Sequence, residues 1–455
     1  MRTRSISFLA PLLMFACSDV TPPAPDSPPS ASARTVPYPG ASASSPTASS
    51  AVTTPTASVK PDAPAPTSEE IAAAKRFATS NNAFGFDVYN EIRNTPGNLA
   101  MSPTSLSVAL AMTWVGAKGD TWTEMRKVLH FESSPADVMR DATLSTQLLE
   151  NPSRGLKISF ANRLFGEKTY TFEKSYLDST DKTFGAGLEA VDFLKDAEKS
   201  RETINAWVEK KTEKRITDLI PSGSLNQDTR LVLVNAIYFL ADWQHPFDKA
   251  RTQPDDFIVS SSNKVRAQMM HHEASYNFAE VDGAKLLELP YQGGEMSMLV
   301  ALPNEADGIA KLEKVLSADK LAEWSKAMKS ERVKVSLPKF EVNPSKATKL
   351  DDALKKLGMK LAFDRKGADF TGMAKPPSPG EQLVVSHVFH KAFVKVDEKG
   401  TEAAAASAVS MSAKGAAPPA AAKELKVDHP FVYLIRDNKT GLVLFMGRVA
   451  DPTVR

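Results

Sequence analysis

The chain has 455 residues, of which 42% are hydrophobic and 24% are charged, proportions typical of a folded protein with a large core. Its formal net charge of +2 argues against a nucleic-acid partner, because binding to nucleic acid calls for a clustered excess of basic side chains. The single cysteine, Cys17, excludes an intrachain disulfide, and no run of apolar residues is long enough to span a membrane as a helix.

The N-terminus has the composition of a targeting signal. Two arginines precede a short apolar stretch from Ile6 to Phe15, and Met14-Phe-Ala-Cys17 ends it. This pattern resembles a bacterial lipoprotein signal, here residues 1–16, which is cleaved before a cysteine that is then lipidated. Met14 stands where such signals usually carry leucine, and an ordinary secretory signal with a chance cysteine is the alternative. We expect lipidated Cys17 to hold the protein in the cell envelope, in the periplasm or at the cell surface; secretion is the alternative.

Residues 17–67 form a second segment of unusual composition. They are rich in Pro, Ser, Thr and Ala and carry scarcely a large apolar side chain. Such a segment cannot bury enough surface to offset the entropy of ordering it. We therefore expect a disordered tether between the lipid and a folded domain at residues 68–455.

The folded domain is predicted to begin with helices and to continue with strands. Ala72 to Ile92 has helical apolar spacing, and Ser102 is placed to cap a second helix, Leu106 to Val115. Alternating segments then predict strands at Leu231–Phe239, Leu286–Leu289, Met296–Leu302, Arg332–Leu337, Phe389–Val396, Phe431–Ile435 and Leu442–Val449. The last two are joined by the hairpin connection Asp437-Asn-Lys-Thr-Gly441. This distribution favours an α+β architecture.

A long segment of small residues separates the strand Phe389–Val396 from the next run with strand character, near Pro430. A loop of roughly 30 residues inside a compact domain is either a functional part or an error of assignment. In a strand, alternate side chains face one way. One face would then carry Thr401, Ala403, Ala405, Ser407, Val409, Met411 and Ala413, which start small and become apolar.

Such a segment could be exposed in one state and lie in the middle of a sheet in another. The opposite face has its only charges at the two ends, Glu402 and Lys414. The alternative is that Glu-Ala-Ala-Ala-Ala is simply a composition that favours helix. The segment alone does not decide between these interpretations.

The order and spacing of several motifs resemble those of the serpin family from about Phe77 to Pro452. Each string is weak alone, but coincidence across all of them is negligible. The motifs are Asn98-Leu-Ala-Met-Ser-Pro-Thr-Ser105, Gly116-Ala-Lys-Gly119, Ala161-Asn-Arg-Leu164, Glu189-Ala-Val-Asp-Phe193, Ile204-Asn-Ala-Trp-Val208, Leu231-Val-Leu-Val-Asn-Ala-Ile-Tyr-Phe239, Leu289-Pro-Tyr291, His390-Lys-Ala392, His429-Pro-Phe431 and Leu444-Phe-Met-Gly-Arg448.

The resemblance implies the serpin fold: three β-sheets with eight or nine helices and an exposed reactive loop, here about residues 398–428. It also implies irreversible suicide inhibition of serine proteases, in which the cleaved loop enters the main sheet as a strand and traps the acyl-enzyme. The implied partner is a target serine protease, bound covalently by a monomeric inhibitor. We expect no cofactor, metal or catalytic residue, and no enzymatic activity.

The resemblance also places the hinge of the reactive loop. Large or charged residues on the inserting face would stop entry, so small residues favour an inhibitor over a non-inhibitory serpin that acts as a carrier or binding module. The hinge residues are Glu398, Gly400, Thr401, Glu402, Ala403, Ala404, Ala405, Ala406 and Ser407.

Counting the usual loop length from Glu398 places the scissile bond between Lys414 and Gly415. Lys414 is the only basic residue between Lys399 and Lys423, so we expect a trypsin-like target. The segment after Lys414 is longer than usual, which leaves a bond after Met411 or Val409 and a chymotrypsin- or elastase-like target as alternatives. A cysteine protease target, or a merely solubilising role for Lys414, are further alternatives.

Four polar residues match the family's shutter, a cluster beneath the point where the main sheet parts: Ser102, Ser105, Asn235 and His390. Asparagine and histidine can exchange hydrogen-bond partners without becoming unpaired, so they suit a region that must open and close. The run His271-His272-Glu273 lacks a third ligand at a spacing that would bind a metal.

Overall fold

The structure is a computed structural model that describes residues 66–150, 156–184, 187–401 and 421–454. All of them lie in one unit, Pro61–Arg455. The predicted signal, Cys17, the predicted tether up to residue 65, the hinge residues Glu402–Ser407 and the Lys414–Gly415 bond lie outside the described residues. No helix in the described part of the chain is both long and apolar enough to cross a bilayer.

The described ranges contain nine α-helices. Both predicted helices are present. The first begins before Ala72, because Thr67 and Glu70 form a reciprocal capping box, and Ser102 caps the second by accepting a hydrogen bond from Ser105 N–H. The helices are α1 Ser68–Ile92, α2 Pro103–Trp114, α3 Gly119–Val128, α4 Pro135–Leu149, α5 Lys174–Phe184, α6 Phe193–Lys211, α7 Ile309–Val315, α8 Ala318–Ala327 and α9 Asp351–Leu357. Two 3-10 turns, η2 Lys249–Arg251 and η3 Leu361–Phe363, also occur.

Seven strands form one sheet, which is called the main sheet below. Its order is β11-β14-β15-β5-β2-β4, with β12 paired to β14. β15 is only two residues long and separates β14 from β5 at one end; over most of their length β14 and β5 pair directly. The strands are β2 Leu156–Glu167, β4 Glu189–Val191, β5 Leu231–Asp242, β11 Phe340–Val342, β12 Thr348–Lys349, β14 Val385–Val396 and β15 Gly400–Thr401.

A second sheet of nine strands has the order β1-β18-β17-β9-β8-β7-β10-β16, with β6 paired to β7. Its strands are β1 Leu99–Met101, β6 Gln253–Ser260, β7 Asn263–Val281, β8 Ala284–Pro290, β9 Met296–Pro303, β10 Lys329–Pro338, β16 Lys423–Lys426, β17 Phe431–Asp437 and β18 Val443–Val449. The short strands β3 Thr171–Phe172 and β13 Ala374–Lys375 form a third sheet. The expected α+β fold with three sheets and eight or nine helices is confirmed.

The expectation that the next strand after β14 starts near Pro430 is wrong. The sequence Lys-Glu-Leu-Lys at 423–426 forms β16, which pairs in parallel with β10 at the end of the second sheet. Only Leu425 of this strand is buried, and its neighbours are charged. An edge strand of this kind has too little apolar alternation to be seen in a sequence.

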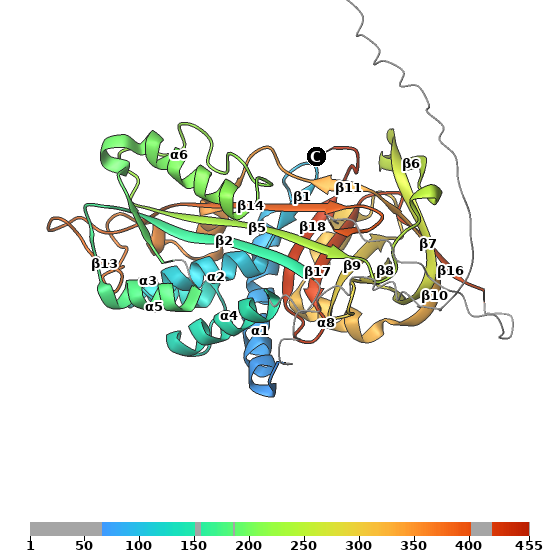
Figure 1. Ribbon diagram of the computed structural model, residues 1–455, viewed down its shortest axis with the longest axis horizontal. Helices are drawn as coiled ribbons and strands as arrows, with labels where there is room; N and C mark the ends of the chain where they lie inside the picture. Colours follow the sequence, from blue (N-terminus) through green and yellow to red (C-terminus); the bar gives the residue numbers. More distant parts are fainter. Residues whose placement is uncertain (1–65, 151–155, 185–186, 402–420, 455) are drawn as a thin grey trace, which may run out of the picture. The chain divides into compact units, whose positions relative to one another are not determined.

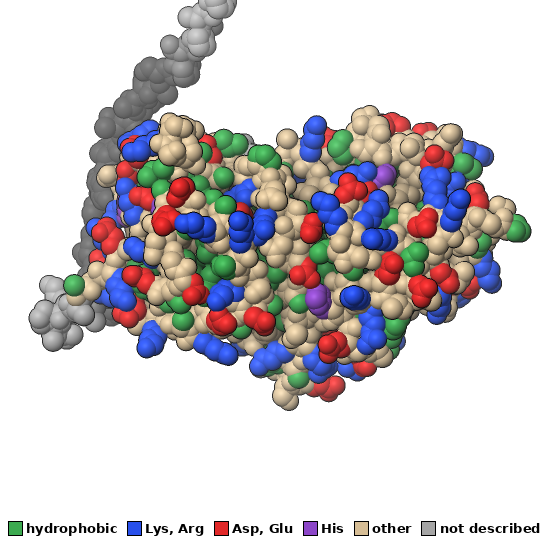
Figure 2. Space-filling view, turned by 180° about the vertical axis from the view of Figure 1, so that it is seen from behind, with side chains coloured by type: hydrophobic (Ala, Val, Ile, Leu, Met, Phe, Trp, Pro, Cys, Tyr) green, Lys and Arg blue, Asp and Glu red, His purple; other side chains and the backbone are tan. Residues whose placement is uncertain are grey.

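Helices cover both faces of the main sheet (Figure 1). On one face, all residues of α2 are buried, and this helix contacts β5 and β2. On the other face, α6 places Phe193, Ile204 and Val208 in a smaller apolar cluster with Phe389 and Phe393 of β14. Basic and acidic side chains are intermingled over the surface seen in Figure 2, in keeping with the small net charge.

Candidate functional site

The central feature of the main sheet is that β5 and β14 are direct neighbours. They pair in parallel from Leu231 opposite Val385 to Tyr238 opposite Phe393. In this chain the strand β14 is followed almost at once by the predicted hinge. The line between β5 and β14 is therefore where an additional strand would have to enter the sheet.

The chain already enters this line at one end. Gly400 and Thr401 form β15, which pairs with Asp242 and Ala241 of β5, while Thr401 also pairs with Val396 of β14. A Cβ atom on Gly400 would lie 1.9 Å from the carbonyl oxygen of Ala241, so only glycine fits here. The sequence placed Gly400 in the hinge, and the structure shows why a glycine stands there: a neighbouring strand approaches its backbone closely.

Thr401 is fully buried at this position. Its hydroxyl lies 2.7 Å from the hydroxyl of Tyr291, which is itself buried. The ring of Tyr291 stacks on that of Trp243, with 4.5 Å between ring centroids. The hinge residue Thr401 is thus already buried in the sheet, in contact with the hydroxyl of Tyr291.

The turn before β15 is anchored by backbone hydrogen bonds. Trp243 donates from its backbone N–H to the carbonyl oxygen of Lys399 at 2.7 Å and from its indole Nε1 to that of Asp397 at 3.0 Å. Phe247 N–H donates to the carbonyl oxygen of Glu398 at 2.8 Å. These bonds hold the turn between β14 and β15 against the end of β5.

The side chain of Glu398 is buried but not isolated. Its carboxylate accepts a hydrogen bond from Thr252 Oγ1 at 2.9 Å and pairs with Lys339 Nζ at 2.8 Å. Burial alone would raise the pKa of Glu398, but the contacts with Lys339 and Thr252 outweigh it and lower the pKa. Glu398 is therefore held as a carboxylate that ties the turn to the second sheet.

The four predicted shutter residues come together beneath the middle of the same line. Ser102 N–H donates to His390 Nε2 at 2.9 Å, and His390 Nδ1 lies against the amide oxygen of Asn235. His390 and Asn235 are register partners on β14 and β5. Their contact therefore spans the two strands that would have to separate.

A fifth residue completes this network and was not predicted. Asn162 of β2 accepts from Asn235 Nδ2 at 2.8 Å and from Ser105 Oγ at 2.6 Å. Its own amide nitrogen is buried, with no partner among the described residues. The motif Ala161-Asn-Arg-Leu164 contained Asn162, but nothing in the string showed that it lies opposite Asn235 in the sheet. We refer to Ser102, Ser105, Asn162, Asn235 and His390 as the polar network.

The polar network fixes the protonation state of His390. Complete burial lowers the pKa of His390 to about 3, despite the hydrogen bond with Asn235. Its Nε2 accepts from a backbone N–H, so a proton on Nε2 would point at another proton. His390 is thus a neutral hydrogen-bonding group, with its one proton on Nδ1.

The histidine pair in β7 is part of the packing beside the anchored turn. His271 Nδ1 lies 2.8 Å from Ser336 Oγ, and His272 Nδ1 lies 2.8 Å from Tyr276 OH. Burial lowers the pKa of both histidines. No group of three potential metal ligands occurs in the part of the chain that the structure describes.

Comparison with known proteins gives a single family. The family model described as "Serpin (serine protease inhibitor)" matches residues 79–452. Human Serpin B3 is 39% identical to this chain over 396 residues, covering 83% of this chain and 99% of that protein. Leukocyte elastase inhibitor A of Rattus norvegicus is 38% identical, covering 83% of this chain and 100% of the relative.

The fold is also similar to solved structures. Uncleaved ovalbumin superposes with a TM-score of 0.74 at 29% sequence identity, and the match covers 83% of this chain and 100% of ovalbumin. The similarity therefore extends over the whole of the compared structure.

Proposed function

Because the chain belongs to the serpin family, we propose that it is an irreversible inhibitor of serine proteases that traps its target by inserting the cleaved reactive loop between β5 and β14. The observation that carries this proposal is the position of Gly400 and Thr401, which already lie between these strands. Ala403 and Ala405 follow Thr401 on the inserting face, so continued entry needs no large side chain to be buried there.

The chemical step belongs to the protease. Its serine attacks the carbonyl carbon of Lys414, the bond to Gly415 breaks, and the amine of Gly415 leaves with a proton. An ester between the protease and Lys414 remains. Insertion then separates β5 from β14, so the contact between His390 and Asn235 must break and new partners must form. The trapped protease loses the tight geometry that hydrolysis of the ester requires.

This role needs no catalytic group in the chain itself, in keeping with the family description as a serine protease inhibitor. A gel separates the alternatives. Mixed with its target, an inhibitor gives a covalent band that survives denaturant, a non-inhibitory carrier gives only cleaved chain, and an enzyme gives neither. We propose that the inhibitor acts as a monomer, because one chain supplies both the loop and the sheet.

The proposed target is a trypsin-like protease. A long cation at Lys414 would pair with the buried carboxylate of a trypsin-like specificity pocket, and removing it would leave that carboxylate unpaired. Lys414→Ala is expected to slow inhibition of trypsin by about 100-fold or more, since each factor of ten corresponds to about 1.4 kcal/mol. Lys414→Arg should retain most of the activity.

Lys423→Ala is the matched control, because Lys423 is the next cation along the chain and lies in β16. It should inhibit at the wild-type rate. Equal inhibition by Lys414→Ala and Lys423→Ala would overturn the assignment of Lys414.

An elastase-like target is the second candidate, supported by the name of the relative that inhibits leukocyte elastase. It requires a bond after Met411 or Val409, which the extra loop length would permit. Mass spectrometry of the fragments distinguishes the two targets, because each bond gives a different mass.

We also propose that Cys17 carries a lipid and that residues 17–67 tether the inhibitor to a membrane of the cell envelope. The support is the sequence pattern described above. Cells that produce Cys17→Ser should release the protein to the soluble fraction, while the wild-type chain should incorporate labelled fatty acid. Release of both proteins without label would favour the secreted alternative.

A further inference from the structure

A pocket lies where β5 and β14 begin, at the end of these strands that is far from β15. Its volume is about 210 Å³, which suits a small ligand better than a drug-sized one. One wall is the turn before β5, with Asn226, Asp228 and Thr229, and the other is the start of β14, with Ser386 and His387. Lys355, Phe363 and Arg365 from the region of α9 and η3 close it.

A β-bulge of the main sheet lies where the two walls of the pocket meet. The β5–β14 ladder has a bulge between Val385 and His387, which leaves Ser386 outside the regular pairing. Ser386 Oγ instead accepts a hydrogen bond from Arg230 N–H at 2.9 Å. Bulges re-aim side chains, and this one directs two successive polar residues of β14 to the pocket.

The acceptors around the pocket are already used. Asn226 Oδ1 accepts from Asp228 N–H at 2.9 Å, and Thr229 Oγ1 accepts from Asn226 N–H at 3.1 Å. The carbonyl oxygen of Asp228 accepts from Arg365 Nη2 at 3.1 Å.

The donors, in contrast, are not used. The amide nitrogen of Asn226 and the hydroxyl protons of Thr229 and Ser386 have no acceptor among the described residues, and His387 engages only Nδ1, at 3.0 Å from Asp351. A pocket with spare donors and occupied acceptors is suited to an acceptor-rich ligand.

The charges of the pocket agree with this. Lys355 and Arg365 face Asp228, whose carboxylate lies 3.6 Å from Arg365. The other nearby carboxylates have partners of their own: Asp351 pairs with His387 and Lys349, and Glu381 lies 3.7 Å from Arg230. Lys355 also lies 3.9 Å from Asp352, an exposed carboxylate that does not line the pocket. Among the lining residues themselves, two cations therefore face one carboxylate.

We propose that this pocket binds a small oxyanion with a phosphate or carboxylate head, and that the bound anion bridges the N-terminal ends of β5 and β14. Asn226 and Thr229 would hold it from the β5 side, Ser386 and His387 from the β14 side. A ligand that binds only while these strands are adjacent stabilises that state by mass action. The anion would thus oppose the last step of loop insertion, a consequence that rests on the proposed inhibitory function.

Inorganic phosphate is the probe for the test. Thermal unfolding of the uncleaved chain is followed while phosphate replaces chloride at constant ionic strength and pH. The wild-type protein should show a saturable rise in Tm. Arg365→Gln should need about tenfold more phosphate for half of the effect, because a hydrogen bond to a charged group is lost.

Lys366→Gln is the matched control, since Lys366 is the adjacent exposed cation and does not line the pocket. Phosphate also stabilises proteins by exclusion from their surface, but that effect does not saturate and is common to all variants. Identical titrations for Arg365→Gln and Lys366→Gln would overturn the site. Lys355→Gln serves as a second pocket variant if Arg365→Gln does not fold.

Cleaved protein with an inserted loop separates the two parts of the proposal. It should lose the saturable response, and an unchanged response would overturn the bridging role. In the uncleaved protein, saturating phosphate should also increase the number of inhibitor molecules cleaved for each protease trapped. Phosphate binding is measured without any protease, so a failure of inhibition and a failure of anion binding are distinct results.

Discussion

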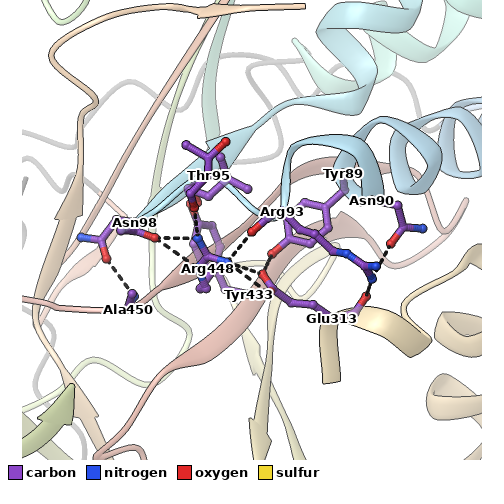
Figure 3. A network of polar contacts seen from close by, with 11 residues as sticks. Tyr89, Asn90, Arg93, Thr95, Asn98, Glu313, Tyr433, Arg448 and Ala450 are labelled. Atoms are coloured by element: carbon purple, nitrogen blue, oxygen red, sulfur yellow. Dashed lines mark hydrogen bonds and ion pairs between the residues drawn. The ribbon is translucent and has the colours of Figure 1, made fainter. Parts of the chain in front are cut away.

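Arg448 shows how a single charged residue is accommodated inside this molecule (Figure 3). Its Nη1 lies 2.9 Å from Glu313 Oε1, and its guanidinium also donates to the carbonyl oxygens of Arg93, Thr95 and Gly97. Tyr89 donates its hydroxyl to the same carboxylate at 2.7 Å. The pair therefore joins β18 to the first helix and to α7, with each of its hydrogen-bonding groups satisfied.

Removing one partner of a buried pair leaves the other charge without compensation. Arg448→Met is expected to lower the free energy of unfolding by about 3–5 kcal/mol, because Glu313 loses its cationic partner and three carbonyl oxygens lose their donor. Urea unfolding followed by far-UV circular dichroism measures this change.

The exposed pair Lys311–Glu305 provides the control, with 2.8 Å between its charged atoms and both side chains in solvent. Lys311→Met should change stability by less than about 1 kcal/mol. If both substitutions cost the same, the Arg448 network is not a special determinant of stability.

His390 makes stability depend on pH. Its pKa is lowered from an ordinary 6.5 to about 3, so above pH 6.5 it is neutral in both states. As the pH falls below 6.5, the unfolded chain binds a proton that the native chain does not, and stability is lost at about 1.4 kcal/mol per pH unit. Comparing wild type with His390→Gln between pH 6.5 and 5 isolates this contribution, because other groups titrate in both proteins.

At the scale of single residues, the sequence identified four members of the polar network but not the hydrogen-bond partner that joins them. Ser102, Ser105, Asn235 and His390 were predicted to lie together and do so, since they stand in three of the quoted motifs. Asn162 was missed because its role depends on the register of β2 against β5, which local sequence does not encode.

At the scale of elements, β15 is the part of the structure with the clearest consequence. Thr401 is fully buried against Tyr291 before any cleavage. Thr401→Arg would place an unpaired cation in this pocket, at a cost of several kcal/mol as an order of magnitude. The variant is expected to be cleaved by the target as a substrate without forming the covalent complex, as seen on a denaturing gel.

Ala404→Arg is the control for this change, because residue 404 would lie on the opposite face of an inserted strand from Thr401. It should retain more of the covalent complex than Thr401→Arg. A wild-type ratio of complex to cleaved chain in Thr401→Arg would show that insertion is not the mechanism.

The elements themselves were predictable where hydrophobic alternation was strong. β5, β9, β17 and β18 were read from the sequence because their buried positions are nearly all apolar. β16 and β15 were not, since β16 has one buried apolar residue and β15 exists only through distant partners in β5 and β14. Tertiary pairing, which a sequence pattern does not contain, decides such strands.

At the scale of the whole molecule, the arrangement of β5 and β14 stores the free energy that inhibition would use. At present one hydrogen-bonded ladder joins the two strands, from Val385 to Phe393 on β14. Insertion replaces it by two ladders, one on each side of the new strand. The net gain is one ladder, with hydrogen bonds worth about 1 kcal/mol each. Val409 and Met411, on the face expected to be buried, would add about 1.5–3 kcal/mol each if fully buried.

Cleavage within the reactive loop is therefore expected to raise the Tm by tens of degrees. The ladder and the two apolar side chains together amount to roughly 10–15 kcal/mol, and about 2–4 °C per kcal/mol applies to domains of 150–250 residues. A larger domain gains less per kcal/mol, but the total remains large. Differential scanning calorimetry of intact and fully cleaved chain measures the shift.

Thr401→Arg is again the internal control: its cleaved form should melt close to its intact form, because the loop is cut but cannot enter the sheet. An unchanged Tm for the cleaved wild-type chain would favour a carrier-type serpin over an inhibitor.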